Sequence, residues 1–407
     1  MKDIEEIRRR LERGEAVVMA APEFKALVRA GERPAADEVD IVTCATVGVM
    51  SGTMAVLSVP VADAGAFGRA TALRLNGVPA HPGPCPNERL GLVDAVVYGT
   101  AHADRRYGGG HLIADLAAGR EIRVEASTDA GDFEARITID DLTSARLVTT
   151  RSAFRNYTAF VNRSEGSVRT IFSATGLSGP LREASVSGCG EINPLQNDPA
   201  LRTIRPGSGV LANGAPGYVM GEGTRSTTER PNIAVFADIR GMDPCTCGGF
   251  VTAAGPECIT SVAAAIPVLD DASIAVLSVL DADIPLPVVD IADRTPFAAA
   301  DYGQVWGGTD RTVTYDPAAC AYCEACAAGA ICPTGAFLTG EGVDPCLCAS
   351  CGACAVACTG GAVTADLGAL EVGERRVPIT IRQSDRKRAE DLCYRLKNGL
   401  LNGKYQF

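Results

Sequence analysis

Eight cysteines near the C-terminal end of the chain have the spacing of iron–sulfur cluster ligands. Each of two runs contains a Cys-x-x-Cys-x-x-Cys triplet and one further cysteine, and the runs are Cys320, Cys323, Cys326 and Cys332, then Cys348, Cys351, Cys354 and Cys358. Three closely spaced thiolates can hold three corners of a 4Fe–4S cube, and the fourth cysteine of each run then reaches the other cluster. The spacing therefore predicts two 4Fe–4S clusters. One would be bound by Cys320, Cys323, Cys326 and Cys358, and the other by Cys332, Cys348, Cys351 and Cys354.

Zinc sites and disulfides are the alternatives for such a cysteine-rich stretch. Zinc ligands come as pairs with a longer gap between them, whereas here two triplets each have a trailing cysteine. The chain has 16 cysteines, and it begins with charged residues where a signal peptide needs an apolar core. This composition favours metal and thiol chemistry in a reducing cytoplasm over a disulfide framework. The longer spacer before Cys332 lengthens one loop and leaves the ligand count unchanged.

Further cysteines are candidates for thiol chemistry outside this stretch. The candidates are Cys44, which ends a predicted strand, Cys245, and two cysteines in glycine-flanked turns, Cys189 and Cys247. Such turns favour access to a thiol and backbone N–H support of its thiolate. Buried packing is the alternative for each of these cysteines. Cys189, Cys245, Cys247 and Cys258 together would also give a third metal site, although Cys-x-Cys spacing is not diagnostic of one.

Polar side chains gather in the turns between residues 156 and 225. The residues that a small zwitterionic ligand would use there are Asn156, Asn162, Asn193, Glu222 and Arg225. Glycine-rich turns that carry such groups are typical of small-molecule sites. Glu191 could hold an ammonium group or donate a proton, and Arg225 could grip a carboxylate in a bidentate pair. The predicted catalytic residues are Cys189, Glu191, Cys44 and Cys247.

Three runs of sequence resemble one known family. They are Asn156-Tyr157-Thr158-Ala159-Phe160-Val161-Asn162-Arg163, Gly188-Cys189-Gly190-Glu191-Ile192-Asn193-Pro194-Leu195 and Gly217-Tyr218-Val219-Met220-Gly221-Glu222-Gly223-Thr224. They resemble the archaeal homocysteine-biosynthesis family, the L-aspartate semialdehyde sulfurtransferases. With its cysteine-rich stretch, the chain is most similar to the branch called methanogenesis marker 16 metalloprotein. The resemblance covers roughly residues 1 to 300 and resumes at 377–403.

The resemblance implies that a thiol is formed from an aldehyde in a methanogenic archaeon. Sulfur would add to the carbonyl of a small molecule, aspartate semialdehyde or a related aldehyde, and water would leave. The sulfur-containing intermediate would then take two electrons, which two 4Fe–4S clusters beside the site would supply. An external electron donor would in turn reduce the clusters.

The sequence departs from the family where sulfur is handled. Family members carry sulfur as a persulfide on a cysteine soon after a strand equivalent to 121–126, where this chain reads Ser127-Thr128-Asp129-Ala130-Gly131-Asp132. Ser51 stands where the family has a second cysteine. Two functions therefore stay open. The chain is either an enzyme that transfers sulfur to a small carbonyl compound, or a non-catalytic iron–sulfur protein that delivers electrons or sulfur for the assembly of a methanogenesis cofactor or enzyme.

The elements that would position these residues predict an α/β fold with a mixed, partly parallel sheet. Helices over 3–14 and 22–30 alternate with strands over 16–20 and 39–44, an order that predicts parallel strand pairing. Small and hydroxyl residues over 45–53 follow the last of these strands, where open α/β sheets bind ligands. The glycines of 107–111 open a predicted helix and are either an anion site or a plain tight turn.

The chain divides into three predicted parts. Residues 1–310 form the α/β body, 311–367 an inserted bacterial-type α+β two-cluster ferredoxin unit, and 368–407 a strand and helix that return to the body. The alternation of Val377, Ile379 and Ile381 predicts the strand, and an apolar stripe from Ala389 to Leu400 predicts the helix.

Composition excludes other classes of protein. A net charge of −11 and an aromatic content of 5% disfavour nucleic-acid binding. The apolar stretch over 259–289 is broken by aspartates and prolines, so we expect no membrane span. The three histidines have no ligand spacing, and the oligomeric state is not predictable from the sequence.

Overall fold

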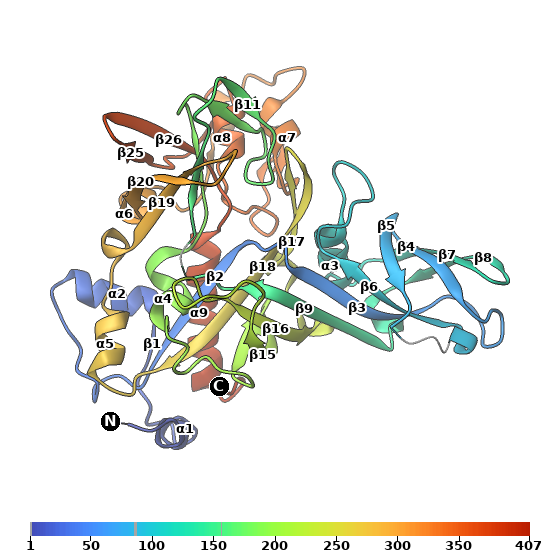
Figure 1. Ribbon diagram of the computed structural model, residues 1–407, viewed down its shortest axis with the longest axis horizontal. Helices are drawn as coiled ribbons and strands as arrows, with labels where there is room; N and C mark the ends of the chain where they lie inside the picture. The colour runs from blue at the N-terminus through green and yellow to red at the C-terminus, as the bar shows by residue number, and fades with distance from the viewer. Residues whose placement is uncertain (1, 85–87, 156) are drawn as a thin grey trace.

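One long mixed sheet runs through the molecule (Figure 1). The computed structural model describes residues 2–84, 88–155 and 157–407. In spatial order the strands of this sheet are β1 (Val18–Ala20), β2 (Ile41–Val49), β18 (Gly255–Pro267), β14 (Gly209–Ala212), β15 (Ala215–Glu222), β16 (Ile233–Asp238), β9 (Ser144–Ser152), β3 (Thr53–Pro60), β6 (Leu92–Tyr98), β5 (Val78–Pro82), β4 (Ala70–Leu75), β7 (Ile122–Thr128) and β8 (Gly131–Ile137), with β17 (Gly248–Thr252) paired to β18. Strands β4, β7 and β8 extend as a wing on the right of Figure 1.

A second, smaller sheet is separate from the long sheet. Its strands in order are β20 (Pro296–Asp301), β19 (Pro285–Asp290), β10 (Ala159–Val161), β13 (Ala184–Val186), β26 (Arg375–Arg382) and β25 (Ala369–Val372). A separate hairpin consists of β11 (Gly166–Val168) and β12 (Leu177–Gly179). The predicted C-terminal strand is β26, and it pairs in parallel with β13.

Helices cover parts of both sheets. They are α1 (Ile4–Glu12), α2 (Ala21–Arg29), α3 (Gly109–Ala117), α4 (Pro194–Asn197), α5 (Asp271–Leu277), α6 (Gly303–Trp306) and α9 (Arg386–Leu401). The last helix, α9, packs against β1, β2 and β18 through its predicted apolar stripe, and Ala389, Cys393 and Leu396 are buried there. Burial of one face of an amphipathic helix is the usual source of its stability in a protein. No helix among the described residues is long and apolar enough to cross a membrane.

Residues 311–367, the cysteine-rich segment, have a small core of their own. Their elements are β21 (Thr314–Tyr315), α7 (Ala327–Ile331), β22 (Phe337–Leu338), β23 (Gly342–Val343), α8 (Ala353–Ala357) and β24 (Val363–Thr364). Strands β21 and β24 pair, β22 and β23 pair, and α7 packs on α8. The core is built from Ala328, Cys332, Ala336, Phe337, Cys354 and Val363. The segment sits beside β25 and β26 in the upper part of Figure 1.

The predicted α/β class is confirmed at the level of a mixed fold. Strands β1 and β2 flank α2 and pair in parallel, as the strand–helix–strand order predicted. Most other pairings are antiparallel, which the sequence did not indicate. The division of the chain into domains stays a prediction.

The prediction of a ligand-binding edge just after Cys44 is wrong. Strand β2 continues to Val49, and Cys44 lies in its middle, fully buried. Residues 41–48 are all buried, because β18 pairs along the whole strand and α9 packs across it. Small residues and threonines can line a ligand site, but they can equally well continue a strand whose two faces are both covered.

The glycines that begin α3 allow close packing. A Cβ atom on Gly109 would lie 2.0 Å from the carbonyl oxygen of Tyr98, and one on Gly110 would lie 2.7 Å from that of Gly248. The turn therefore packs on the sheet, which fits the interpretation as a plain tight turn.

Candidate functional site

A charged cavity of about 320 Å³ lies beside the first turn of α9. Its polar lining includes Arg29, Glu191, Asp281, Arg311, Arg386 and Glu390, and Trp306 supplies an aromatic wall. We call it the Glu191 cavity. It combines carboxylates and guanidinium groups in one space of small-molecule size.

Buried ion pairs organise this cavity. The Arg386 side chain is 3% exposed, and its Nη2 lies 3.1 Å from Oε1 of Glu191, which is 1% exposed. Its Nη1 lies 3.2 Å from Oδ2 of Asp281 and donates to the Cys189 carbonyl at 2.7 Å. Arg29 contacts Glu191 from the outer side. Buried charges are tolerated when they are paired and hydrogen-bonded in this way.

The pKa values of the two buried carboxyl groups, Glu191 and Asp281, are shifted in opposite directions. Burial would raise the pKa of Glu191, but the Arg386 and Arg29 charges outweigh it and lower that pKa. Burial raises the pKa of Asp281, with Arg386 only partly opposing. Neighbouring carboxyl groups whose pKa values move apart are suited to separate acid and anion roles.

The turn that carries Glu191 requires its glycines. Gly188 has φ +107°, and a Cβ there would lie 2.2 Å from the hydroxyl of Tyr302. Gly190 has φ +57°, and its Cβ would lie 2.0 Å from Oδ1 of Asp281. The Tyr302 hydroxyl donates to the Ser187 carbonyl at 2.7 Å. Glycines at these positions let the backbone approach both partners closely.

The predicted thiols Cys189 and Cys44 do not line the cavity. Cys189 is fully buried, contrary to the access that its glycine-flanked turn suggested, and its Sγ lies 3.7 Å from the Val47 carbonyl oxygen. Burial raises the pKa of Cys189 to about 11 and that of Cys44 to about 12. Both are therefore neutral thiols at neutral pH.

Lys25 is a buried cation near Cys44. Its Nζ donates to Oδ1 of Asn197 at 3.1 Å and to the carbonyls of Leu277 and Val279 at 2.5 and 2.9 Å. Burial lowers the pKa of Lys25 to about 8. Lys25 is fully buried, so its hydrogen bonds are part of what holds α2 to the body.

The predicted substrate-binding residues do not converge. Asn162 donates to the carbonyls of Gly166 and Leu177, and so holds the β11–β12 hairpin. Asn193 caps α4 and donates to the Phe154 carbonyl at 2.8 Å. Glu222 and Arg225 are exposed near the end of β15. Asn156 lies outside the described residues. Of the predicted residues that the structure describes, Glu191 lines the cavity and these four do not.

Sequence reasoning missed the polar junction between β26 and α9. Ser384 Oγ accepts from the Gly188 N–H at 2.7 Å, and Gln383 donates to the Phe172 carbonyl at 2.6 Å. Arg382 donates to the carbonyls of Asp310 and Val305 and stacks 4.3 Å from the Trp306 ring. The available signal was a run of seven polar residues, 382–388, between an apolar strand and an apolar helical stripe.

A second cavity, of about 240 Å³, contains the thiol of Cys247. We call it the Cys247 cavity, and His111, Tyr107 and Arg388 also line it. Burial, together with Asp243, raises the pKa of Cys247 to about 12, against the Arg388 charge. Burial lowers the pKa of His111, so its ring is neutral at neutral pH.

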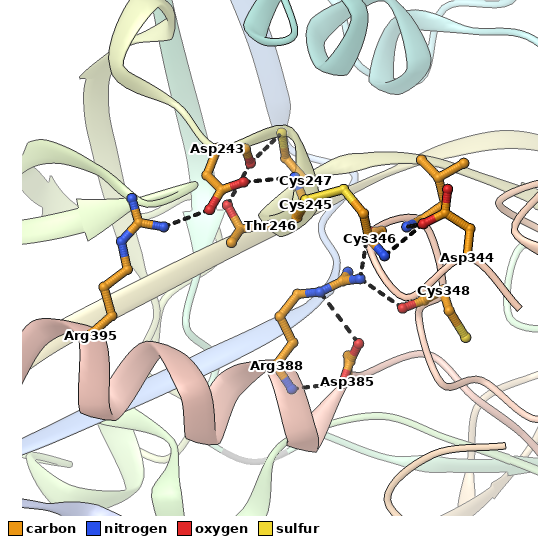
Figure 2. Close-up of a disulfide and its surroundings, with 11 residues drawn as sticks. Asp243, Cys245, Thr246, Cys247, Asp344, Cys346, Cys348, Asp385, Arg388 and Arg395 are labelled. Carbon is orange, nitrogen blue, oxygen red and sulfur yellow. Dashed lines mark hydrogen bonds and ion pairs between the residues drawn. A yellow bond between two sulfur atoms is a disulfide. The ribbon is translucent and has the colours of Figure 1, made fainter. Parts of the chain in front are cut away.

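A disulfide between Cys245 and Cys346 adjoins the Cys247 cavity and links the body to the cysteine-rich segment (Figure 2). Arg388 of α9 donates to the carbonyls of Cys346 and Cys348 at 2.9 and 2.7 Å. The alternative of a third metal site at Cys189, Cys245, Cys247 and Cys258 does not fit the observed disulfide. Cys245 is bonded to Cys346, and no group of three or more His, Cys, Asp or Glu side chains converges on a metal position within residues 2–84, 88–155 and 157–407.

The eight predicted cluster ligands have the donor chemistry of 4Fe–4S sites. None of them is in a disulfide. Burial raises the pKa of Cys351 well above its ordinary value, and Cys348, Cys354 and Cys332 lie near enough to raise it further. These four cysteines are therefore near one another, but neither predicted ligand set converges on a metal position within the described residues. In the other predicted set, Cys326 Sγ accepts from the Gly329 N–H at 3.4 Å, a support typical of thiolates.

The sequence defines the class of protein. Residues 16–407 match the family described as "Homocysteine biosynthesis enzyme, sulfur-incorporation". The chain therefore belongs to this family of sulfur-incorporating enzymes.

Relatives in methanogens fall into two groups. A protein of Methanothermobacter thermautotrophicus with no assigned function is 46% identical over 99% of this chain and 94% of its own length. A second such protein, MJ1681 of Methanocaldococcus jannaschii, is 37% identical over 96% of this chain and 99% of its own. The L-aspartate semialdehyde sulfurtransferase of M. jannaschii is 32% identical over 74% of this chain and 62% of its own. No solved structure matches the chain.

Proposed function

We propose that this chain incorporates sulfur into a small carbonyl compound that it binds in the Glu191 cavity. The observation that carries the proposal is the pairing of carboxylates with guanidinium groups in that cavity, in a member of a sulfur-incorporation family. A cavity lined by both signs of charge suits a ligand that itself has a carboxylate and an ammonium group.

Specific groups in the cavity match such a ligand. Arg311 and Arg29 are only partly buried, so they can turn toward a substrate carboxylate and bind it through two parallel hydrogen bonds. Glu390, whose Oε1 lies 3.8 Å from Nε of Arg311, can accept from an ammonium group. The proposed substrate class is therefore an amino-acid aldehyde. Aspartate semialdehyde, named in two relatives, belongs to this class.

The proposed reaction balances with two electrons. Hydrogen sulfide adds to the aldehyde carbonyl, water leaves to give a thioaldehyde, and two electrons and two protons reduce the C=S bond to a thiol. Asp281 holds its proton more firmly than an ordinary aspartate, so we assign it the donation of a proton to the departing hydroxyl group. Glu191 stays anionic and positions Arg386.

We also propose that the cysteine-rich segment binds two 4Fe–4S clusters, held by the two sets of four cysteines. Such clusters supply electrons one at a time at low potential. Contacts to the body support this arrangement. Arg106 donates to the carbonyl of Cys332 at 3.2 Å, and the N–H of Arg382 donates to that of Cys351 at 2.9 Å.

The two ligand sets differ in exposure, which supports a direction for electron entry. Cys332, Cys351 and Cys354 are buried, whereas Cys323 is exposed and Cys320 is half-buried. The set containing Cys323 is therefore where an external electron donor would meet the chain, and the other set faces the body.

A second function is favoured by one observation. Cys44 and Cys189 are fully buried, and residues 127–132 contain no cysteine, so the body lacks the family's sulfur-carrying thiol. The chain would then be an iron–sulfur protein that delivers electrons or sulfur to a partner without acting on a carbonyl compound.

Substitution of Arg311 distinguishes the two functions. Chemically reduced protein is given sulfide and aspartate semialdehyde without oxygen, and thiol formation is measured. Arg311→Leu should lower kcat/KM by about 10-fold to 100-fold, because the substrate would lose its hydrogen bonds to a charged group. Arg376→Leu is the matched control, since that side chain is 75% exposed. Equal rates for wild type and Arg311→Leu would contradict the proposed site, and no turnover by wild type would favour the delivery function.

A further inference from the structure

We propose that Cys245 and Cys346 are a sulfur-releasing pair, an inference that rests on the proposed function. Cys245 carries a sulfur atom as a persulfide, and Cys346 displaces that atom as sulfide. The disulfide between them is then the product of sulfide release. The pair would supply what the missing family cysteines supply elsewhere.

The disulfide joins two parts of the chain that are far apart in sequence. The Cα atoms of Cys245 and Cys346 are 4.5 Å apart, although 101 residues separate them. Cys245 lies in the short helical turn η5 (Pro244–Thr246) of the body, and Cys346 follows β23 in the cysteine-rich segment. Both residues are only partly buried, so a sulfur donor can reach them.

Neighbouring side chains fix both cysteines. The N–H of Cys245 donates to Oδ1 of Asp243 at 3.0 Å, and Oδ2 of Asp243 pairs with Arg395 of α9 at 2.6 Å. Arg388, on the same helix, donates to the Cys346 carbonyl at 2.9 Å. Figure 2 shows the two arginines reaching from one helix to the two sides of the disulfide. The two sulfur atoms would therefore stay close after the bond is reduced.

Residues next to both cysteines in the sequence line the Cys247 cavity. Pro244 precedes Cys245, Leu347 follows Cys346, and both line this cavity of about 240 Å³. Pro244, Cys247, Gly248 and Gly249 line it from the segment around Cys245, whereas Thr334 and Leu347 line it from the cysteine-rich segment. We therefore assign the persulfide to Cys245 and the displacing thiol to Cys346. A disulfide that only joined two parts of the fold would need no cavity beside it.

The chemistry balances in three steps. A donor persulfide R–S–SH and the Cys245 thiol give Cys245–S–SH and R–SH. The Cys346 thiol then attacks the Cys245 sulfur, so the disulfide forms and hydrogen sulfide leaves. A reducing dithiol restores both thiols and is itself oxidised to a disulfide by thiol–disulfide exchange. Sulfide is the nucleophile that the proposed reaction at the Glu191 cavity consumes.

The test supplies sulfur without any aldehyde. Reduced, cluster-loaded protein is treated anaerobically with polysulfide enriched in a heavy sulfur isotope, and labelled sulfide and labelled peptides are measured by mass spectrometry. Wild type should release about one labelled sulfide per chain and end with the Cys245–Cys346 disulfide, as the balanced steps require. Cys346→Ser should release at least about 10-fold less and keep the label on Cys245. Cys245→Ser should carry no label on either peptide.

Control and contrary outcomes are distinct. Cys393→Ser, a buried thiol on α9, should behave like wild type. The inference is overturned if Cys346→Ser releases as much labelled sulfide as wild type, or if the label is found on another cysteine. It is also overturned if wild type releases sulfide without forming the disulfide.

Adding aldehyde separates this inference from the proposed function. With free sulfide and reduced clusters, Cys346→Ser should form thiol at the wild-type rate, and with polysulfide it should not. Equal thiol formation from polysulfide by both proteins overturns the sulfur-releasing pair and leaves the proposed function standing. If labelled sulfide is released but no thiol forms from either sulfur source, the sulfur-releasing pair stands and the proposed function is overturned.

Discussion

At the scale of single residues, the Glu191 cavity depends on charges that are costly to bury alone. Arg386 is nearly inaccessible, and its guanidinium group contacts Glu191 and Asp281 in two directions. Removing one partner of a buried pair leaves an uncompensated charge. The same groups therefore decide both stability and binding.

Glu191→Gln should destabilise the fold. The substitution keeps the shape of the side chain but removes the charge that Arg386 faces, so the free energy of unfolding should fall by about 3 kcal/mol. Chemical denaturation followed by circular dichroism measures it. Glu222→Gln, at an exposed position, is the control and should change stability by less than about 0.5 kcal/mol. Equal stabilities of the two variants would show that the pair is not buried as described.

Lys25 makes stability depend on pH in the alkaline range. Its pKa is lowered from 10.5 to about 8, so between these values the unfolded chain binds more protons than the folded one. Stability from this group must therefore rise with pH in that window. Relative to the Lys25→Met variant, the free energy of unfolding of wild type should rise by up to about 3 kcal/mol from pH 8 to pH 10.5 and change little below pH 8. A difference that does not vary with pH would contradict a buried Lys25.

At the scale of elements, the turn at 187–191 and the β26–α9 junction bring the site together. Gly190 lets the turn approach Asp281, and Ser384 and Arg386 fix the turn from the other side. Glu191, Asp281 and Arg386 are separated by up to 195 residues. Sequence patterns are local, so they indicated Glu191 as a polar residue in a turn but could not identify its partners.

Gly190→Ala should disrupt the cavity. The new Cβ would need a positive φ and would also collide with the Asp281 carboxylate, so we expect a loss of about 3 kcal/mol in stability together with weaker substrate binding. Gly166→Ala is the matched control. It has φ +84° with open space around the Cβ, and should lose only about 1 kcal/mol. Denaturation midpoints of the two variants check the difference. If Gly190→Ala were no worse than Gly166→Ala, close packing on Asp281 would be excluded.

The elements themselves were more predictable than the site. The first helices, strand β1 and helix α9 follow from periodicity and stop signals, and the structure has them within a few residues. The sequence predicts that this strand ends at Cys44, whereas β2 continues to Val49. Small residues and threonines resemble a loop in the sequence when the helix that covers them lies far away along the chain. The antiparallel majority of the long sheet also depends on distant pairings.

At the scale of the whole molecule, α9 connects three parts. Its first turn contacts the Glu191 cavity through Arg386 and the cysteine-rich segment through Arg388, and its apolar face packs on the long sheet. Electrons from the segment would therefore have a short distance to travel to the body. The cysteine spacing alone suggested the cluster ligands, because all eight lie within one short stretch of sequence.

Anaerobically prepared protein should contain about eight irons per chain as two 4Fe–4S clusters. Cys351→Ser should lose about half of that iron, because it removes one ligand of one cluster. Cys346→Ser and Cys393→Ser should keep the wild-type iron content. Metal analysis and electron paramagnetic resonance of the reduced protein make the measurement. One cluster in wild type, or stoichiometric zinc in place of iron, would contradict the ligand assignment.

The stoichiometry of the reaction tests the central claim most directly. Wild-type protein is given aspartate semialdehyde, sulfide and a measured amount of a reduced one-electron dye without oxygen, and all three are followed together with the thiol product. Reductive sulfur incorporation predicts that one aldehyde, one sulfide and two electrons disappear for each thiol formed. Oxidation of the dye without consumption of aldehyde and sulfide would contradict the claim and assign the chain to electron delivery.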